Sequence, residues 1–301
     1  MINMEITKRN GNVCFSEETH TYWNENDNKK YISVTTLIGK YVTPFDKDFW
    51  SAYKALEKLI PSDYWKLEKQ ALLNTKKINP ELLERHNITQ NDLNKVQQDI
   101  LDEWQKKNIE SCERGTKMHL EIENSFYAGG KNVTLKKFGI GGKFECKKNY
   151  VELDLPKGVY PEYLVSVIDD NLRLAGQIDL LIKDNNDISL IDHKSCIKID
   201  KSSGYNPVLK TKTKMLYPLN NLQDCNFYHY SLQLSTYAWM LQKINPEFCI
   251  KNLILNHYDH EGHNYLHYCD YLKDDVERMI KHYKKSLILE EQKNKRKRIE
   301  Y

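Results

Sequence analysis

The chain has 301 residues, long enough for one large domain or two small ones, and its 40% hydrophobic residues can supply a core. Its 45 Lys and Arg nearly balance its 42 Asp and Glu, so the net charge of +3 does not by itself indicate a nucleic-acid partner. No apolar run approaches the ~18 residues of a membrane span, and the opening MINMEITKRNGN lacks the apolar segment of a secretory signal. We therefore expect no membrane partner and a cytoplasmic location. The composition is rich in Asn, Lys and Ile, which is associated with AT-rich genomes, so the expected setting is a bacterium or a virus-infected cell.

The N-terminal part predicts a hairpin followed by helices. VCFSEETHTYW and KYISVTTLI flank an Asn- and Asp-rich turn, which is typical of a β-hairpin. Over residues 45–108, apolar residues recur every three or four positions and Pro61 and Pro80 interrupt the pattern, so we predict an arm of separate helices. A further helix is expected over about Ser111–Phe126, ended by the Gly-Gly pair that follows.

The central part predicts strands. YPEYLVSVID, LRLAGQIDLLIKD and DISLIDHKS are rich in Val, Ile and Leu and are separated by short turn-prone segments, so they predict a three-strand meander. After a polar loop over residues 198–221, NFYHYSLQLSTYAWMLQKI predicts a helix that ends before Pro246. A second hairpin follows, and then a last helix that begins with acidic and ends with basic residues, as suits its own dipole.

Three charged residues interrupt the two apolar strands of the meander. Asp179 lies in GQIDLLI, and Asp192 and Lys194 lie in ISLIDHKS. Residues at i and i+2 share one face of a strand, so Asp192 and Lys194 point together, and the meander lets Asp179 reach the same place. Unpaired charges near an apolar sheet cost several kcal/mol, so ion pairing or a bound cation must offset them. Two carboxylates favour a hard cation, Mg²⁺ or Mn²⁺.

These groups are the parts that phosphodiester hydrolysis needs. A divalent ion neutralises charge on the phosphate and lowers the pKa of a bound water, and a neighbouring lysine can orient or deprotonate that water. We expect Asp179 and Asp192 to be metal ligands and Lys194 to be the catalytic cation. The backbone carbonyl of His193 is a further candidate ligand, with its side chain on the opposite face.

An ordered set of motifs resembles the PD-(D/E)XK nuclease superfamily, and within it the RecB-like exonucleases, which include Cas4-like and mitochondrial genome-maintenance exonucleases. The motifs are RGTKMH with His119, PEYLVSV with Glu162, GQID with Asp179, IDHKS with Asp192 and Lys194, and QLSTY with Gln233 and Tyr237. Two departures are an Asp where many members have Glu in the third motif, and the absence of the clustered cysteines of the iron-sulfur branch. The branch without a cluster is therefore the nearer comparison.

The resemblance implies a fold and further roles. The fold would be α/β, a restriction-endonuclease-like core with a mixed central sheet flanked by helices and a helical N-terminal elaboration. One nuclease domain would span 1–301, with a hairpin and helical arm over 1–110, the core over 111–270 and a basic C-terminal helix over 271–301. The implied roles are metal binding by His119, catalysis by Glu162 and DNA contacts by Arg114, Gln233 and Tyr237.

Each candidate also has a purely structural interpretation, which the sequence leaves open. The charged residues of the two central strands would form an ion pair, and Glu162 would be a solvated carboxylate. His119 would be a helix histidine satisfied by its neighbours, Tyr237 a core residue, and Arg114 a partner in a surface salt bridge.

The function expected from the sequence is Mg²⁺-dependent hydrolysis of DNA by an exonuclease. Its substrate would be single-stranded DNA or processed DNA ends in replication, recombination or repair, with proteins of those pathways as further partners. Two alternatives are a structure-specific endonuclease on the same fold and a catalytically inactive nucleic-acid-binding module. An RNA substrate also stays open, because no residue pattern reports on a 2′-hydroxyl.

Overall fold

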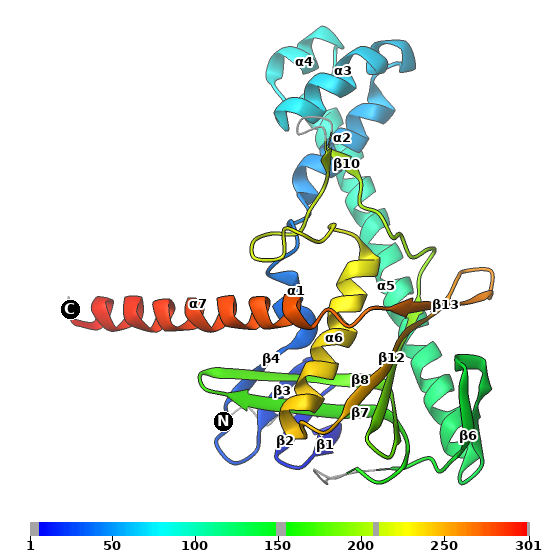
Figure 1. The fold of residues 1–301 in the computed structure, drawn as a ribbon. Coiled ribbons are helices and arrows are strands. Elements are labelled where there is room, and N and C mark those ends of the chain that lie inside the picture. The colour runs from blue at the N-terminus through cyan, green and yellow to red at the C-terminus, as the bar shows by residue number, and fades with distance from the viewer. Residues whose placement is uncertain (1–5, 149–154, 207–210, 300–301) are drawn as a thin grey trace. The chain divides into compact units, whose positions relative to one another are not determined.

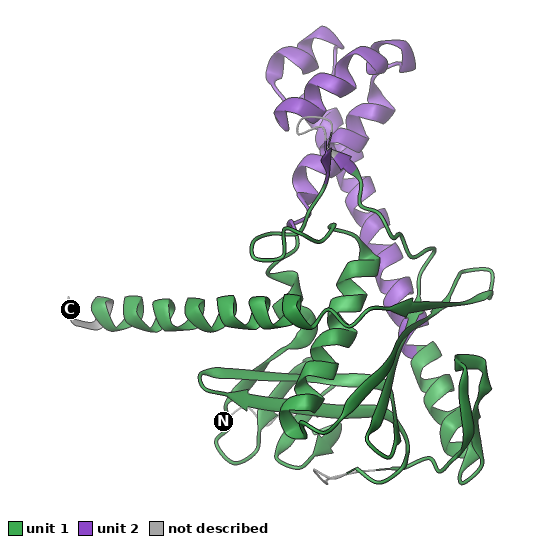
Figure 2. Cartoon of the chain, in the orientation of Figure 1, with its two compact units in different colours: residues 1–42, 117–204, 213–301 green, residues 43–116, 205–212 purple. Residues whose placement is uncertain are grey.

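The structure is a computed structural model that describes residues 6–148, 155–206 and 211–299. The chain forms two compact units (Figure 2). Unit 1 consists of residues 1–42, 117–204 and 213–301, and unit 2 of residues 43–116 and 205–212. The predicted organisation as one nuclease domain stays a prediction.

In the described part of unit 1, nine strands form a mixed sheet (Figure 1). The β4–β8 and β9–β12 pairs are parallel and the other pairs are antiparallel. Along the sheet the order is β1 (Lys8–Asn10), β2 (Val13–Ser16), β3 (Thr21–Asn24), β4 (Lys30–Ser33), β8 (Leu172–Asp184), β9 (Asp187–Ser195), β12 (Cys249–Tyr258) and β13 (Asn264–Cys269), with β7 (Gly158–Asp169) paired to β8.

The predicted meander is confirmed as β7, β8 and β9. Two-residue turns join these strands, and Asp170 and Asn185 adopt φ values of 54° in them. Asp and Asn tolerate this left-handed conformation, which matches the twist of a tight hairpin. The second predicted hairpin is confirmed as β12 and β13, with the turn between Tyr258 and Asn264.

The first predicted hairpin is only partly correct. Strands β2 to β4 form antiparallel pairs as expected, but the segment VTTLIG is not a continuation of the strand. It forms helix α1 (Val34–Gly39), because the Ser33 side chain caps the helix by accepting a hydrogen bond from the backbone N–H of Thr36 at 3.0 Å. The helix then buries Leu37 and Ile38.

Helices cover both faces of the sheet of unit 1, which confirms the predicted α/β class. Helices α6 (Asn226–Ile244) and α7 (Lys273–Ile299) pack with α1 on one core cluster, which includes Leu181 and Leu190 of the meander. The last turns of α5 (Gln90–Gly129) pack on the alternate residues, such as Leu180, with β5 (Val133–Leu135), η1 (Lys136–Phe138) and β6 (Ile140–Phe144). As predicted, α6 ends before Pro246.

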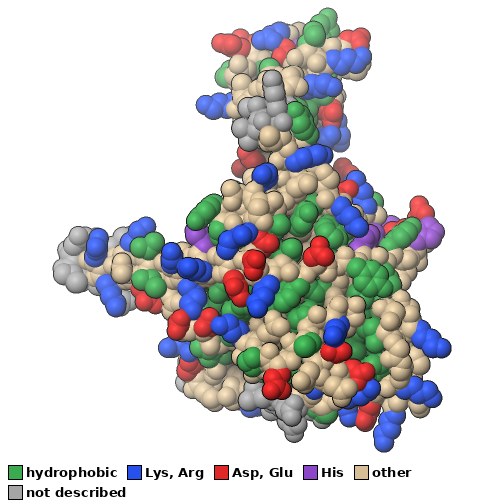
Figure 3. Space-filling model, viewed as in Figure 1, with side chains coloured by type: hydrophobic (Ala, Val, Ile, Leu, Met, Phe, Trp, Pro, Cys, Tyr) green, Lys and Arg blue, Asp and Glu red, His purple; other side chains and the backbone are tan. Residues whose placement is uncertain are grey.

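Helix α7 begins with acids and becomes basic along its length. Its first turn holds Asp274 and Asp275, and its later turns include Lys281, Lys284 and Lys285. Figure 3 shows Lys and Arg side chains along this helix. The prediction of a basic C-terminal helix is confirmed for α7, which runs to Ile299, the last described residue of the chain.

Unit 2 is helical and has its own apolar core. It contains α2 (Lys47–Leu59), α3 (Ser62–Thr75), α4 (Pro80–Arg85) and the part of α5 up to Thr116, together with β10 (Tyr205–Asn206) and β11 (Thr211–Lys212). Pro61 immediately precedes α3 and Pro80 begins α4, as predicted from the breaks in periodicity. The core includes Leu56, Trp65 and Ile100.

Helix α5 begins earlier than the helix predicted over Ser111–Phe126. It starts at Gln90, where Thr89 and Asp92 form a reciprocal capping box with N···O distances of 3.1 and 3.2 Å. It ends at the predicted glycine pair, and Gly130 adopts a φ of 53°.

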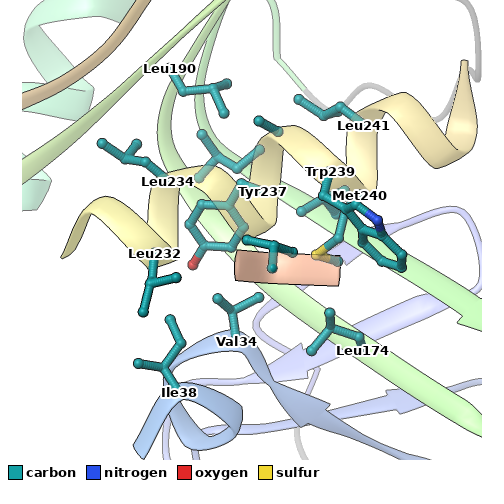
Figure 4. Packing of buried hydrophobic residues seen from close by; sticks show 14 of the residues in the cluster. Val34, Ile38, Leu174, Leu190, Leu232, Leu234, Tyr237, Trp239, Met240 and Leu241 are labelled. Atoms are coloured by element: carbon teal, nitrogen blue, oxygen red, sulfur yellow. The ribbon is translucent and has the colours of Figure 1, made fainter. Parts of the chain in front are cut away.

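Gly176 and Tyr237 connect the meander to α6. A Cβ atom on Gly176 would lie 2.6 Å from Cε1 of Tyr237, which is closer than two non-bonded carbon atoms approach each other. Figure 4 shows the Tyr237 ring among Val34, Ile38 and Leu174. The GQID and QLSTY motifs therefore pack against each other, and the glycine leaves room for the ring.

We predict that Gly176→Ala destabilises the protein by about 1–3 kcal/mol, because the added methyl group forces the buried ring or the strand to shift. The matched control is Gly141→Ala in β6, where an added Cβ meets nothing within 4 Å. Urea unfolding measures both free energies. Equal midpoints for the two variants would contradict the close contact.

Candidate metal centre

Strand β8 changes its neighbour at the point where the candidate residues lie. One edge of β8 pairs with β7. The other edge pairs with β4 at Leu174 and Ala175, and with β9 only from Leu180 onward. Between these two ladders, no strand in the described part of the chain pairs with the β8 residues that end at Asp179 on that edge. The carboxylate of Asp179 uses this opening and accepts a hydrogen bond from the backbone N–H of His193 at 2.6 Å.

Three carboxylates share one level of the meander. In the β7–β8 register, the residues just before and just after Glu162 pair with the residues just after and just before Asp179, so Glu162 lies opposite Asp179. The β8–β9 register, continued by one position, places Asp192 opposite Asp179 on its other edge. Side chains at one register level of neighbouring antiparallel strands lie side by side on the sheet. Three acidic groups on adjacent strands would repel one another strongly without cations between them.

Glu162 has a strained backbone. Its φ is +52°, a left-handed conformation that costs about 1–3 kcal/mol for a residue other than glycine. Contacts from three elements hold the side chain: Gln177 donates to Oε2, the Lys8 ammonium lies 3.6 Å from Oε2, and Nδ1 of His119 lies 3.2 Å from Oε1. Strain maintained by surrounding contacts is typical of functional sites.

His119, Glu162 and Asp179 can hold a metal ion. One ligand atom from each lies within 4.8 Å of the others, and Nδ1 of His119 is 3.7 Å from Oδ2 of Asp179. Nε2 of His119 also lies 3.1 Å from the carbonyl oxygen of His193. The His193 side chain lies on the opposite face of β9 from Asp192, as predicted, where its Nδ1 is 2.8 Å from Nδ2 of Asn256 and its ring centroid is 6.2 Å from that of His119. Two carboxylates and one imidazole suit a divalent cation that prefers oxygen ligands.

Asp192 belongs to a second, adjoining group. It is 1% exposed, and its carboxylate pairs with the Lys194 ammonium at 2.7 Å and accepts a hydrogen bond from the Gln233 amide at 3.1 Å. The three-residue ligand group does not include Asp192. The predicted role of Asp192 as a direct metal ligand therefore stays a prediction, while its pairing with Lys194 is observed. A buried carboxylate with these two partners holds the ammonium in a fixed place.

The protonation of the group reflects burial and mutual charge. Burial raises the pKa of Asp179 to about 7, and the charge of Asp192 adds to this effect. Burial lowers the pKa of His119, but the Glu162 hydrogen bond and the Asp179 charge outweigh it and raise the pKa to about 9. Burial also lowers the pKa of Lys194, but the charges of Asp192 and Asp179 outweigh it and raise that pKa. The His119 imidazolium thus occupies the ligand group as a cation at neutral pH.

The residues predicted to contact DNA lie in different surroundings. Gln233 and Tyr237 are 8% and 4% exposed, and the Gln233 amide lies 3.4 Å from the Tyr237 hydroxyl. Gln233 therefore contacts Asp192 from within the core, and Tyr237 contacts Gln233. Arg114 lies in unit 2 on α5, where its guanidinium is 3.5 Å from Oγ of Ser111. A contact with DNA stays a prediction for all three.

Two contacts of Glu162 were not predicted from the sequence. Gln177 precedes Asp179 by two residues on the same strand, so strand periodicity could have placed it beside the site. Lys8 had no such signal, because its position depends on the contact of β1 with β7, where Nδ2 of Asn10 donates to the Leu164 carbonyl at 2.7 Å.

Comparisons with known proteins give little further information. No family model matches the chain, and no curated protein does. Among solved structures, a putative exonuclease from Eubacterium rectale is similar with a TM-score of 0.32 and 9% identity, covering 84% of this chain and 79% of its own. A similarity this low supports no argument about function. Among the described residues, no helix has a stretch both long and apolar enough to cross a bilayer.

We predict that Mn²⁺ or Mg²⁺ binding strengthens as the pH rises from about 6 to 9. The metal binds deprotonated ligands, and the pKa values of Asp179 and His119 are about 7 and about 9, so binding must displace protons below those values. The apparent affinity should rise about tenfold per pH unit for each proton released. Titration calorimetry in buffers of different ionisation enthalpy counts these protons.

Asp179→Asn is the control for this measurement, because it removes one titrating ligand and should weaken both the affinity and the proton release. An affinity that does not change over this pH range would contradict metal binding at these residues.

Proposed function

We propose that this protein is a metal-dependent nuclease of the PD-(D/E)XK type that hydrolyses phosphodiester bonds in DNA. One observation carries the proposal: Glu162, Asp179 and Asp192 lie at one level of three adjacent strands, with His119 on one side and Lys194 on the other. A structural ion pair needs only Asp192 and Lys194. A divalent ion also accounts for the two further carboxylates and the histidine at ligand spacing.

The side chains of the site would have distinct roles in hydrolysis. A divalent ion bound there supplies charge neutralisation at the scissile phosphate and a water of lowered pKa. Glu162, Asp179, His119 and the His193 carbonyl would hold the ion. Because hydrolysis needs an oriented water and a counter-charge for the phosphate, the Lys194 ammonium would orient the water and offset negative charge in the transition state.

Asp192 and Gln233 would position the lysine. The carboxylate of Asp192 holds the Lys194 ammonium, and the Gln233 amide in turn donates to that carboxylate. Tyr237 lies next to Gln233 and packs on Gly176, so it would keep α6 in register with β8. We propose this supporting role for Gln233 and Tyr237 because both side chains are buried.

The finer assignment is an exonuclease of the RecB-like type. We propose Mg²⁺ or Mn²⁺ as the cofactor and single-stranded or processed DNA ends as the substrate. The resemblance of the ordered motifs to that family supports this assignment.

We predict that EDTA and Lys194→Ala each abolish DNA cleavage while DNA binding is largely kept. Removing the ammonium should slow cleavage by about 100-fold or more, a loss typical of one transition-state charge partner. The measurement is digestion of end-labelled single-stranded and duplex DNA in Mg²⁺, with a gel-shift assay for binding. Lys157→Ala is the matched control, because Lys157 pairs with Asp184 at 2.7 Å at the surface of the same meander. Undiminished cleavage in EDTA and in Lys194→Ala would refute the mechanism.

We predict that linear single strands are digested and closed single-stranded circles of the same sequence are not. An exonuclease needs a free end, whereas an endonuclease on the same fold would cut both. Comparing digestion of the two substrates on a denaturing gel decides between the two activities. Digestion of circles at the rate of linear strands would favour the endonuclease.

A further inference from the structure

A cavity of about 540 Å³ lies beside Glu162 in unit 1. Strand β1, strand β7 and the last turns of α5 form its walls. Cavities that bind small molecules in proteins have volumes of about 300–1,000 Å³, so a ligand the size of a nucleotide fits the range.

The cavity adjoins the ligand group. Glu162 belongs to both, because it lines the cavity and offers a ligand atom to the metal group. On α5, His119, Glu123 and Tyr127 follow one another at four-residue spacing and therefore lie on one face of the helix. The face that carries the metal-ligand candidate His119 thus continues along the cavity wall. A chain whose phosphate lies at the ligand group can place the adjoining nucleotide in the cavity.

The cavity wall combines cations, aromatic rings and a hydrogen-bond acceptor. Lys8 and Lys147 are 26% and 19% exposed at their side chains, so both ammonium groups are partly withdrawn from water. The Tyr127 hydroxyl donates to Glu123 at 3.0 Å, which orients that carboxylate as an acceptor. Cations suit a phosphate, and an oriented carboxylate suits a sugar hydroxyl or a base amino group. A nucleotide offers both kinds of partner, whereas inorganic phosphate offers only one.

Lys8 connects the cavity to the metal group. Its ammonium lies 3.6 Å from Glu162 Oε2 and 3.9 Å from the carboxylate of Glu17. A lysine this close to a metal ligand opposes cation binding by charge repulsion, unless an anion joins it. A phosphate group at Lys8 would supply that anion. The arrangement therefore favours a phosphate and a divalent ion that bind together on opposite sides of Glu162.

We propose that this cavity is a subsite for the terminal nucleotide of the DNA strand, with Lys8 contacting its phosphate. The subsite rests on the proposed nuclease function and explains how the protein would act at an end. One nucleotide fills the cavity while the next phosphodiester lies at the ligand group. Cleavage would then release mononucleotides.

Calorimetry with deoxythymidine 5′- and 3′-monophosphate tests the subsite without relying on cleavage. Either monophosphate should bind more tightly than thymidine and more tightly than inorganic phosphate. Mn²⁺ should increase the affinity for both monophosphates. Lys8→Ala should weaken monophosphate binding by about tenfold, the effect of losing a charged hydrogen bond, and leave thymidine binding unchanged. Lys8→Arg should restore most of the loss, and a far-ultraviolet spectrum checks that each variant is folded.

The matched control is Lys251→Ala, because Lys251 pairs with Asp187 at 3.5 Å and does not line the cavity. Equal monophosphate affinity in wild type, Lys8→Ala and Lys251→Ala overturns the subsite, even if wild type cleaves DNA. Absence of monophosphate binding to wild type overturns it as well. Binding that depends on Lys8 in a protein that cleaves no DNA supports the subsite and refutes the proposed function instead.

Product length is a second readout. Digestion of end-labelled single strands should yield mononucleotides with wild type and Lys251→Ala. Lys8→Ala should shift the products towards short oligonucleotides, because the end is no longer held in a fixed place. An unchanged product length in Lys8→Ala contradicts the role of Lys8.

Discussion

The change of neighbours along one edge of β8 is the constraint on which the rest of the site depends. Between the β4 and β9 ladders, the carboxylate of Asp179 can accept the backbone N–H of His193, and this bond of 2.6 Å sets where the His193 carbonyl faces. That carbonyl in turn lies 3.1 Å from His119. A continuous ladder would use the same backbone groups for strand pairing, and the carboxylates would have no opening to share.

The site depends on both electrostatics and packing. Burial and the charge of Asp192 leave Asp179 partly protonated near neutral pH, and a bound divalent ion would displace that proton. Gln233 donates a hydrogen bond to Asp192, and Tyr237, on the same helix, fills the space left by Gly176. The positions of the charged groups therefore depend on an apolar contact between a helix and a strand that carries no chemistry itself.

Local patterns predicted most of the secondary structure, and the errors have local causes. The meander and α6 followed from apolar periodicity and turn residues. Periodicity alone misassigned the VTTLIG segment, because the cap at Ser33 turns a pattern compatible with a strand into a helix. The start of α5 was missed for a similar reason, since the capping box at Thr89 and Asp92 lies within a long polar stretch.

By itself the sequence determined which residues could do chemistry on the meander, because the strand period of two places Asp192 with Lys194 and the hairpins bring Asp179 level with them. Only the tertiary structure decided how those charges are partnered. It separated Asp192, paired with Lys194, from a ligand group of His119, Glu162 and Asp179. It also brought Lys8 to Glu162. The contacts of His119 and Lys8 with Glu162 join residues far apart in the chain, and their distances follow from packing between elements, which no local pattern encodes.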